Sequence, residues 1–514
     1  MTKQLYKSTA IVSGMTLISR VMGFIRDMLI ANIFGVSPAT DAFFVAFKIP
    51  NFLRRLFAEG AFAHAFVPVL SDYKQNAAPA ELKSFIDKTA GTLTVLLMVL
   101  TLVGVLATPL LIVFFAPGFL WQGSHYELAV SLLRITFPYL LFISLTAFAG
   151  SILNAHGRFA VPAITPVFLN ICMIMAALWL APLFDEPVLA LAWGVFAAGV
   201  IQMLFQWPAL ARLGLLPRLA WGWRDSGVRR VLRLMLPAIF GVSVVQVNLL
   251  FDTLVASFLA AGSVSWLYYS DRLVEFPLGI LGVAVSSVIL PSLSNSHAEQ
   301  DSFAFSRSLD WGLKLVMLIG LPATLGLVLL ARPLLATLFQ YNEFGADDVA
   351  MTSSSLMAFA LGLLAFILIK VLVPGFTARQ DAKTPVRFGL YSIVGNVLLN
   401  LVLVWPLAHA GVALATTLSA YLNAGLLLMA LLKQKIYRPG RGWLLFMGRV
   451  IFGCLLMVGF LIRAAEGQTW LDWGVSQRSG HLLFEVMAAM LVYAAGLVLV
   501  GMRPRHLHEH SADS

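Results

Sequence analysis

Long apolar segments alternate with short polar connections along almost the whole chain. A helix needs about 20 mainly apolar residues to cross a hydrocarbon core of about 30 Å. Fourteen segments reach this length, near residues 10–33, 41–70, 86–115, 127–153, 160–182, 188–210, 231–260, 264–293, 309–331, 352–374, 386–405, 411–432, 444–464 and 481–502. We therefore predict an all-α integral membrane protein with about 14 transmembrane helices.

The composition agrees with this pattern and excludes a soluble domain of useful size. The 514 residues are 60% hydrophobic and 12% charged, whereas an average soluble domain has about 25% charged residues. Lys3 and Lys7 precede the first apolar segment, but no small-residue cleavage site follows a short apolar region, so we interpret this segment as a span. The two cysteines, Cys172 and Cys454, lie in separate apolar segments and predict neither a disulfide framework nor a metal site.

Lysine and arginine collect in every second connection between the predicted spans. The basic connections are 74–88, Arg158, 212–233, Arg307, 379–387 and 433–441, while the intervening ones are short or acidic, such as 184–187 and 341–348. Because short basic connections stay on the cytoplasmic side, we predict that both termini are cytoplasmic. The net charge of +10 reflects this asymmetry and contact with anionic lipid headgroups. We expect no nucleic-acid partner.

Similar segments recur at a spacing of about 224 residues. "TPLLIVFFAPGF" at residue 108 resembles "RPLLATLFQYNEF" at residue 332, and "APLFDEPVLALAWG" at residue 181 resembles "WPLAHAGVALATT" at residue 405. The spacing predicts two copies of a six-helix unit, which an even number of spans makes parallel. The predicted organisation is an N-terminal lobe at 1–220, a C-terminal lobe at 221–434, and two appended helices with a cytoplasmic tail at 435–514.

Charged residues lie inside several of the predicted spans. Arg20, Arg26, Asp41, Lys48 and Arg54 lie in the first two spans, and the second copy has its own charged stretch, "YYSDRLVEFPLG" at 268–279. A charge at the bilayer centre is costly and usually faces a bundle interior or an aqueous cavity. Pro50 and Pro277, inside these charged stretches, predict a kink or break of the helix. We interpret the charges as the lining of a cavity between the two lobes.

Two explanations of these charges remain open. Some could be internal ion pairs or lysines that reach the membrane surface, namely Arg26 with Asp27, Arg55 with Glu59, Arg272 with Glu275, and the lysines Lys48 and Lys370. Arg20 and Arg54 have no acidic neighbour at helical spacing, so their surplus charge requires an anion. Arginine binds phosphate oxygens in pairs and stays charged, which favours a phosphate-bearing substrate.

The segments "SRVMGFIRD", "ATDAFFVAFKIPNFLRRLFAEGAF", "GSVSWLYYSDRLVEFPLGILGVA" and "VPGFTARQDAKTP" resemble the MurJ (MviN) family of lipid II flippases. This family belongs to the superfamily that also contains multidrug and oligosaccharidyl-lipid exporters, with MATE-like lobes. The resemblance implies an inner-membrane protein that moves the undecaprenyl-pyrophosphate-linked peptidoglycan precursor from the cytoplasmic to the periplasmic leaflet for cell wall synthesis. Alternating access of the two lobes is the expected mechanism.

The resemblance also implies which residues bind the substrate. The cavity arginines of the family fall on Arg20, Arg26, Arg54 and Arg272, and the same stretches contain Asp41, Lys48, Glu59 and Ser265. We hypothesise that Arg26, Arg54 and Arg272 bind the diphosphate and that Arg20 assists. The resemblance implies in addition that the helices at 444–464 and 481–502 form part of an apolar groove for the polyprenyl tail.

The energy source is left open by the sequence. No GxxxxGK[ST] phosphate-binding loop occurs, so we expect neither ATP hydrolysis nor a bound cofactor. The resemblance suggests a monovalent cation site at Asp252 with Thr377 and Asp381, although the other positions of that site are apolar here. The alternatives are that Asp252 carries a proton or pairs with Arg272, and that the membrane potential drives transport.

An enzyme is the competing class of function, and the sequence argues against it. His64, His125, His156 and His409 have no metal-ligand spacing, and no catalytic triad or pair of carboxylates is evident. We therefore expect a transporter without a metal, functional as a monomer, with lipid II and membrane lipids as its partners. The alternatives within transporters are a flippase for another polyprenyl-linked glycan, such as O-antigen, and a multidrug antiporter.

Overall fold

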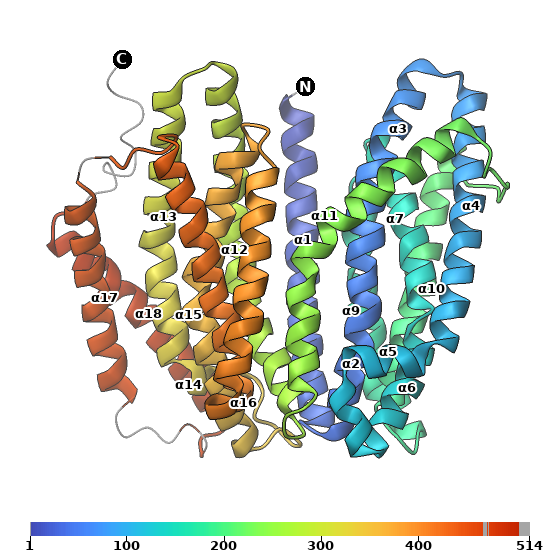
Figure 1. Ribbon diagram of the computed structural model, residues 1–514. Coiled ribbons are helices and arrows are strands. Elements are labelled where there is room, and N and C mark those ends of the chain that lie inside the picture. The colour runs from blue at the N-terminus through green and yellow to red at the C-terminus, as the bar shows by residue number, and fades with distance from the viewer. Residues whose placement is uncertain (1, 441, 466–469, 471, 503–514) are drawn as a thin grey trace. The chain divides into compact units, whose positions relative to one another are not determined.

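The computed structural model describes residues 2–440, 442–465, 470 and 472–502, and every regular element in these ranges is a helix (Figure 1). The prediction of an all-α protein is therefore confirmed. By packing, the chain divides into two compact units, Met1–Ser265 and Trp266–Ser514. Among the described residues, nine segments are long and apolar enough to cross a membrane: Pro79–Leu106, His125–Ala155, Ala160–Leu183, Leu189–Arg212, Ser302–Leu329, Ala346–Thr377, Lys383–Lys433, Trp443–Ala464 and Val475–Leu499.

Unit 1 contains the first eleven α-helices and several short helices of other types. Their bounds are α1 (Thr2–Phe34), α2 (Pro38–Leu53), the π-helix η1 (Arg54–Phe62), α3 (Ala63–Asn76), α4 (Pro79–Leu106), α5 (Thr108–Phe115), the 3₁₀-helix η2 (Pro117–Gln122), α6 (Ser124–Thr136), α7 (Tyr139–Ala155), α8 (Ala160–Ile164), α9 (Val167–Met175), the π-helix η3 (Ala176–Leu180), the 3₁₀-helix η4 (Ala181–Leu183), α10 (Leu189–Arg212) and α11 (Ser226–Ala256). The next helix, α12 (Ser263–Ala298), begins in unit 1 and continues into unit 2.

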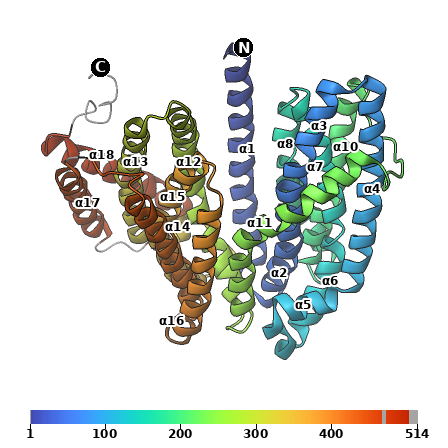
Figure 2. The same ribbon diagram turned by 45° about the horizontal axis from the view of Figure 1, so that its top comes forward.

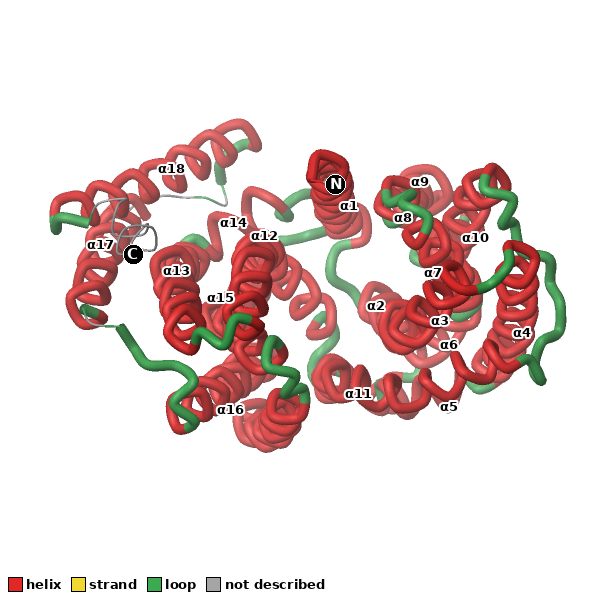
Figure 3. The backbone as a smooth tube through the Cα atoms, turned by 90° about the horizontal axis from the view of Figure 1, so that it is seen from above, coloured by secondary structure: helices red, strands yellow, loops and turns green. Residues whose placement is uncertain are grey.

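The core of unit 1 forms around α7, which lies among α3, α4 and α10 when the helices are viewed from above (Figure 3). Phe66 of α3 stacks on Phe85 of α4, with ring centroids 5.8 Å apart, and contacts Phe148 of α7 at 5.0 Å. All three rings are buried. Because lipid tails are as apolar as these rings, they hold the helices together by close packing rather than by exclusion of water.

α11 runs across unit 1 and packs against η1 and α3 (Figures 1 and 2). It begins where the Asp225 side chain accepts hydrogen bonds from the backbone N–H groups of Gly227 and Val228, at 3.0 and 3.3 Å. This helix belongs to the C-terminal lobe predicted at 221–434, whereas the division by packing falls after Ser265. The lobe boundary rests on sequence similarity, not on packing, and stays a prediction.

Pro50 lies inside α2, and the helix continues past it to Leu53. Proline has no N–H, so the carbonyl of Ala46, four residues earlier, loses its usual helical donor. The hydroxyl of Thr136 in α6 donates to that carbonyl at 3.2 Å instead. The irregular part of the segment comes after the proline, where the π-helix η1 begins at Arg54. α12 is likewise continuous across Pro277, so the chain has no break there.

Unit 2 contains the rest of α12 and six further helices: α13 (Ser302–Leu329), α14 (Ala331–Leu338), α15 (Ala346–Thr377), α16 (Lys383–Lys433), α17 (Trp443–Ala465) and α18 (Val475–Leu499). The central helix is α15, which packs against both α13 and α16 (Figures 1 and 2). α16 has 51 residues and is interrupted at Ala408, where φ is 47° and ψ is −128°. Ala408 lies between the predicted spans 386–405 and 411–432.

The last two helices pack against each other, and α17 also packs against α13. Leu330, Met457, Leu461 and Ala489 form a buried apolar cluster in this region. Arg478 of α18 is buried and donates to the backbone carbonyls of Ala336 at 2.8 Å and Gln340 at 3.3 Å, at the end of α14. A guanidinium at the carbonyl end of a helix is electrostatically favourable, so this contact fixes α18 to α14.

Candidate functional site

Arg26 lies on α1 and is the most enclosed of the predicted site arginines, with 4% of its surface exposed. Its guanidinium donates to one carboxylate oxygen of Asp27 from Nε at 2.9 Å and from Nη2 at 2.6 Å. Nη1 donates to the Asn170 Oδ1 atom of α9 at 2.9 Å. The Asn170 amide in turn donates to the backbone carbonyl of Ser19 at 3.0 Å. The ion pair of Arg26 with Asp27 that the sequence suggested is therefore present.

Two further basic residues of unit 1 lie on the segment around Pro50. The ammonium group of Lys48 donates to the Thr253 hydroxyl of α11 at 3.1 Å, which connects α2 with α11. Arg54, at the start of η1, donates from Nε to the Asn51 side chain at 3.1 Å. π-Helical turns are rare and occur often at functional sites. The lysine and the arginine thus bracket the change from α-helix to π-helix.

Arg20 is half-buried on α1, and within the described residues it forms no ion pair. The other predicted pair, Arg55 with Glu59, cannot be followed, because the side chain of Glu59 lies outside the described residues. The place of Glu59 in the site stays a prediction for the same reason.

Asp41 and Ser265, both predicted to contact substrate, bind each other. One carboxylate oxygen of Asp41 accepts hydrogen bonds from the Ser265 N–H at 2.8 Å and the Ser265 hydroxyl at 2.6 Å. The other oxygen accepts from the backbone N–H of Gly262 at 2.7 Å. Both residues are buried, with exposures of 4% and 0%. The negative charge thus lies at the N-terminal end of α12, where the helix dipole favours it, and it connects α2 to α12.

In unit 2, Arg272 of α12 forms the ion pair with Glu275 that helical spacing suggested, with Nη1 and Oε2 at 2.6 Å. Its guanidinium also lies over the ring of Tyr268, 5.1 Å from the centroid, where a cation is attracted to the aromatic face. The side chains of Arg272 and Glu275 are 29% and 42% exposed. The arginine of the second charged stretch is therefore held by its own helix and remains accessible.

The three residues predicted for a cation site belong to different units. Asp252 is half-buried on α11 in unit 1. Thr377 is the exposed last residue of α15 in unit 2, and the Asp381 carboxylate accepts a hydrogen bond from the Thr384 backbone N–H at 3.0 Å. Hydrogen bonds from the side chain and backbone of Thr384 lower the pKa of Asp381 below its ordinary value. The Asp381 carboxylate is therefore bound to the start of α16.

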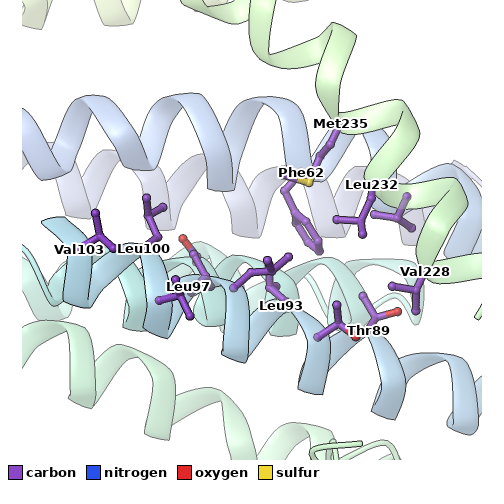
Figure 4. Close-up of a pocket in the computed structure, with 14 residues that line it drawn as sticks. Phe62, Thr89, Leu93, Leu97, Leu100, Val103, Val228, Leu232 and Met235 are labelled. Carbon is purple, nitrogen blue, oxygen red and sulfur yellow. The ribbon is translucent and has the colours of Figure 1, made fainter. Parts of the chain in front are cut away.

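Unit 1 also contains an apolar cavity of about 410 Å³ between α4 and α11 (Figure 4). Phe62, Leu93 and Met235 point into it from η1, α4 and α11, and the described lining residues include no charged side chain. Among the described lining residues, the polar side chains are those of threonines and a serine, such as Thr89 and Ser144. Without a cation, this cavity is unsuited to a diphosphate, so the candidate site remains with the basic residues.

The structure reveals several functional candidates that sequence reasoning missed. Asn170 orients Arg26, and Thr253 accepts a hydrogen bond from Lys48. Arg478 and Glu485 of α18 are both buried, with exposures of 6% and 2%. A polar or charged residue inside a long apolar segment is itself a signal of an interior position, and all four could have been selected on that basis.

Comparisons with known proteins show the family to which the chain is similar. A family model described as "Lipid II flippase MurJ" matches residues 30–479. A relative from Vibrio cholerae serotype O1, named "Probable lipid II flippase MurJ", is 48% identical over 514 residues, with 98% of each chain covered. A solved structure of "Lipid II flippase MurJ, inward closed conformation" matches with a TM-score of 0.80 and 26% identity, covering 95% of this chain and 98% of that chain.

A second solved structure extends the likeness in fold. It is an inward-facing multidrug resistance MATE family transporter of the MOP superfamily, with a TM-score of 0.64 and 15% identity, and the match covers 83% of this chain and 98% of that chain. At this identity the likeness shows the fold alone.

Proposed function

The chain belongs to the MurJ family of lipid II flippases, as its motifs predicted, and we propose that it moves lipid II from the cytoplasmic to the periplasmic leaflet by alternating access. It is a multi-pass membrane protein and a transporter, not an enzyme. The observation that carries this conclusion is the relative that matches 98% of the chain at 48% identity. A match of that length extends over the charged stretches of both units.

We propose a finer architecture of 14 spans: two parallel six-helix lobes, two appended helices and both termini in the cytoplasm. The interruption of α16 at Ala408 supports the count, because it divides one long helix where two spans are predicted. The basic connections support the orientation. A functional monomer is part of the same proposal.

In the proposed site, Arg26, Arg54 and Arg272 bind the diphosphate of lipid II, and Arg20 assists. Asp27 and Glu275 each hold one of these arginines in the structure. A carboxylate partner lowers the cost of keeping an arginine inside the membrane while no substrate is bound. The diphosphate then replaces the carboxylate as the anionic partner of Arg26 and Arg272, so these two arginines exchange one charged contact for another.

The other predicted residues hold the helices that carry these arginines. Asp41 and Ser265 connect α2 to the start of α12, the helix of Arg272, and Lys48 connects α2 to α11. For the polyprenyl tail we propose an apolar surface formed with α17 and α18, whose exposed side chains include Leu444, Leu455 and Leu491. Long apolar tails require no hydrogen bonds from such a surface.

We propose two alternative energy sources for transport. Either a monovalent cation binds at Asp252 with Thr377 and Asp381, or Asp252 carries a proton or pairs with Arg272 while the membrane potential contributes. Transport assays with and without sodium separate these forms. Sodium-independent transport together with normal activity of Asp252→Asn would exclude the cation site.

The test of the function is periplasmic accessibility of labelled lipid II in cells depleted of their own flippase and supplied with this chain. We expect the wild-type chain to restore accessibility, and Arg54→Ala and Arg54→Lys to fail, because lysine cannot contact two phosphate oxygens in the same plane. Arg218→Lys, in an exposed connection, is the matched control. Full activity of Arg54→Lys would remove Arg54 from the diphosphate site.

A further inference from the structure

Unit 2 contains a polar cavity of about 340 Å³ that the proposed transport site does not use. It lies where α12, α15 and α16 end and α13 begins. His297 and Asp301 line it from the connection between α12 and α13, Arg379 from the end of α15, and Lys435 from the end of α16. All three connections belong to the basic set predicted to face the cytoplasm, so a cytoplasmic ligand would reach this cavity directly.

The charges in this cavity favour an anion. Arg379 and Lys435 contribute two positive charges, and within the described residues neither forms an ion pair. The one carboxylate in the lining, Asp301, accepts a hydrogen bond from the backbone N–H of Ala304 at 2.8 Å and caps α13. Nearby Asp381 is bound by Thr384 in the same way. Both carboxylates keep their negative charge when they accept these hydrogen bonds, so the lining residues Arg379, Lys435 and Asp301 together carry a net charge of +1.

The first residue of α13, Ser302, also lines the cavity. α13 has 28 residues, and its N-terminal end therefore presents the positive pole of a long helix to the same space. Backbone N–H groups at such an end suit phosphate oxygens. Phe305, one turn later and 4% exposed, gives the cavity an apolar wall that could contact the organic part of a ligand.

The backbone at the cavity gives a separate argument. Lys435, two residues after the end of α16, has φ 56°, and Gln300, two residues after the end of α12, has φ 58°. This left-handed conformation favours glycine, and in unit 1 the residues two positions after the ends of α7 and α10 are Gly157 and Gly214, at φ 73° and 69°. Unit 2 therefore keeps a lysine at a position where glycine would be less strained. Strain of this kind is typical of positions whose side chain has a function.

We propose that this cavity binds a phosphate-bearing anion through Arg379, Lys435 and the start of α13. The chemistry fits two sources: a soluble phosphate ester of the cytoplasm and the headgroup of an anionic phospholipid in the cytoplasmic leaflet. The cavity shares no residue with the proposed diphosphate site at Arg20, Arg26, Arg54 and Arg272. Anion binding in this cavity can therefore be tested separately from lipid II transport, and the failure of one proposal does not decide the other.

The test uses the full chain in nanodiscs of zwitterionic phosphatidylcholine and follows hydrogen exchange of the peptides covering 296–305, 377–384 and 432–438. Inorganic phosphate is titrated in one arm, and the fraction of phosphatidylglycerol in the discs is raised in the other. The test variant is Arg379→Gln with Lys435→Gln. Its matched control is Lys433→Gln with Arg438→Gln, which removes the same charge from neighbouring exposed residues outside the cavity.

We expect one of the two anions to slow exchange in all three peptides of the wild type. In the test variant, the anion concentration that gives half of the maximal protection should rise by at least about tenfold, because two charge-assisted contacts are removed. In the control variant, this concentration should stay within about twofold of the wild-type value. Protection by phosphate identifies a soluble source, and protection by phosphatidylglycerol alone identifies a lipid headgroup. Absence of protection by both, or equal loss in the control, would overturn the proposal.

Discussion

The two units each contain an arginine paired with a carboxylate at the same distance, yet in different surroundings. Arg26 with Asp27 and Arg272 with Glu275 both have N···O distances of 2.6 Å. The side chains of the first pair are 5% and 2% exposed, and those of the second are 29% and 42% exposed. Distance alone would rank the two pairs as equal. Burial makes the first pair more costly to separate than the second, whose side chains are partly exposed.

The neighbours of each pair extend this contrast. Arg26 has a polar partner from another helix, Asn170 of α9, so its position depends on how α1 and α9 pack. Arg272 is held by Glu275 and Tyr268, both from its own helix. Glu275 lies on the same helix as Arg272 and both side chains are partly exposed, whereas access to Arg26 requires α1 to separate from α9. We infer that the two arginines meet the diphosphate at different stages of transport.

The largest expected effect is that of Asp27→Ala. This variant leaves the Arg26 guanidinium buried without its carboxylate, and removing one partner of a buried pair costs about 3–5 kcal/mol. We expect a clear fall in the thermal unfolding midpoint of the purified protein in detergent. The double variant Arg26→Met with Asp27→Leu, which removes both charges, should recover the midpoint but not transport. An unchanged midpoint for Asp27→Ala would show that water reaches this pair.

The next effect is that of Asn170→Leu, which tests the contact between helices. It removes the acceptor for Arg26 and the donor to the Ser19 carbonyl, and a buried group left without its partner costs about 1–3 kcal/mol. We expect a smaller fall in the same unfolding midpoint together with reduced transport. Asn154→Leu, at an exposed position near the end of α7, is the matched control. If Asn170→Leu and Asn154→Leu lowered the midpoint and transport equally, the hydrogen bond of Asn170 with Arg26 would have no specific role.

Much of the architecture followed from the sequence because it depends on local pattern. Apolar length identified the helical class. Adjacency in the sequence suggested the pair of Arg26 with Asp27, and helical spacing suggested the pair of Arg272 with Glu275. The position of the interruption in α16 also followed, since Ala408 lies between two apolar segments. The sequence predicted a kink or break at Pro50, but α2 continues past it to Leu53. The hydroxyl of Thr136, far away in the sequence, binds the carbonyl that the proline leaves without a donor.

The partners of the site residues could not be predicted, because they depend on tertiary contacts. The resemblance placed Asp41 and Ser265 in one site as substrate contacts, but their hydrogen bond to each other joins residues 224 positions apart. Asn170 was visible as a polar residue in an apolar segment, yet nothing in the pattern connected it with Arg26. Glu485 was overlooked because the whole segment around it is apolar, and the segment was therefore interpreted as facing lipid.

A third prediction compares the ends of helices in the two units. Gln380 follows α15 in unit 2 and has φ 61°, whereas the left-handed residue that follows α7 in unit 1 is Gly157, with φ 73°. A non-glycine residue in this conformation costs about 1 kcal/mol, so Gln380→Gly should raise the unfolding midpoint and Gly157→Ala should lower it. Gln300→Gly is a second position at which the midpoint should rise. Opposite signs would show that the Gln380 side chain stabilises unit 2 by more than the strain costs.

The smallest effect is expected for Glu275→Gln, and it decides how far the contrast between the two pairs extends. An exposed ion pair contributes about 0–1 kcal/mol, so the unfolding midpoint should stay nearly unchanged, in contrast to Asp27→Ala. The variant frees Arg272 from its carboxylate, and we therefore expect tighter binding of inorganic pyrophosphate to the purified protein, measured by calorimetry at low ionic strength. Asp271→Gln, at the exposed neighbouring position, is the control for the loss of a negative charge. If Glu275→Gln and Asp271→Gln bind pyrophosphate equally, Glu275 affects binding only through its negative charge and not through its ion pair with Arg272. The proposed difference between Arg272 and Arg26 would then be wrong.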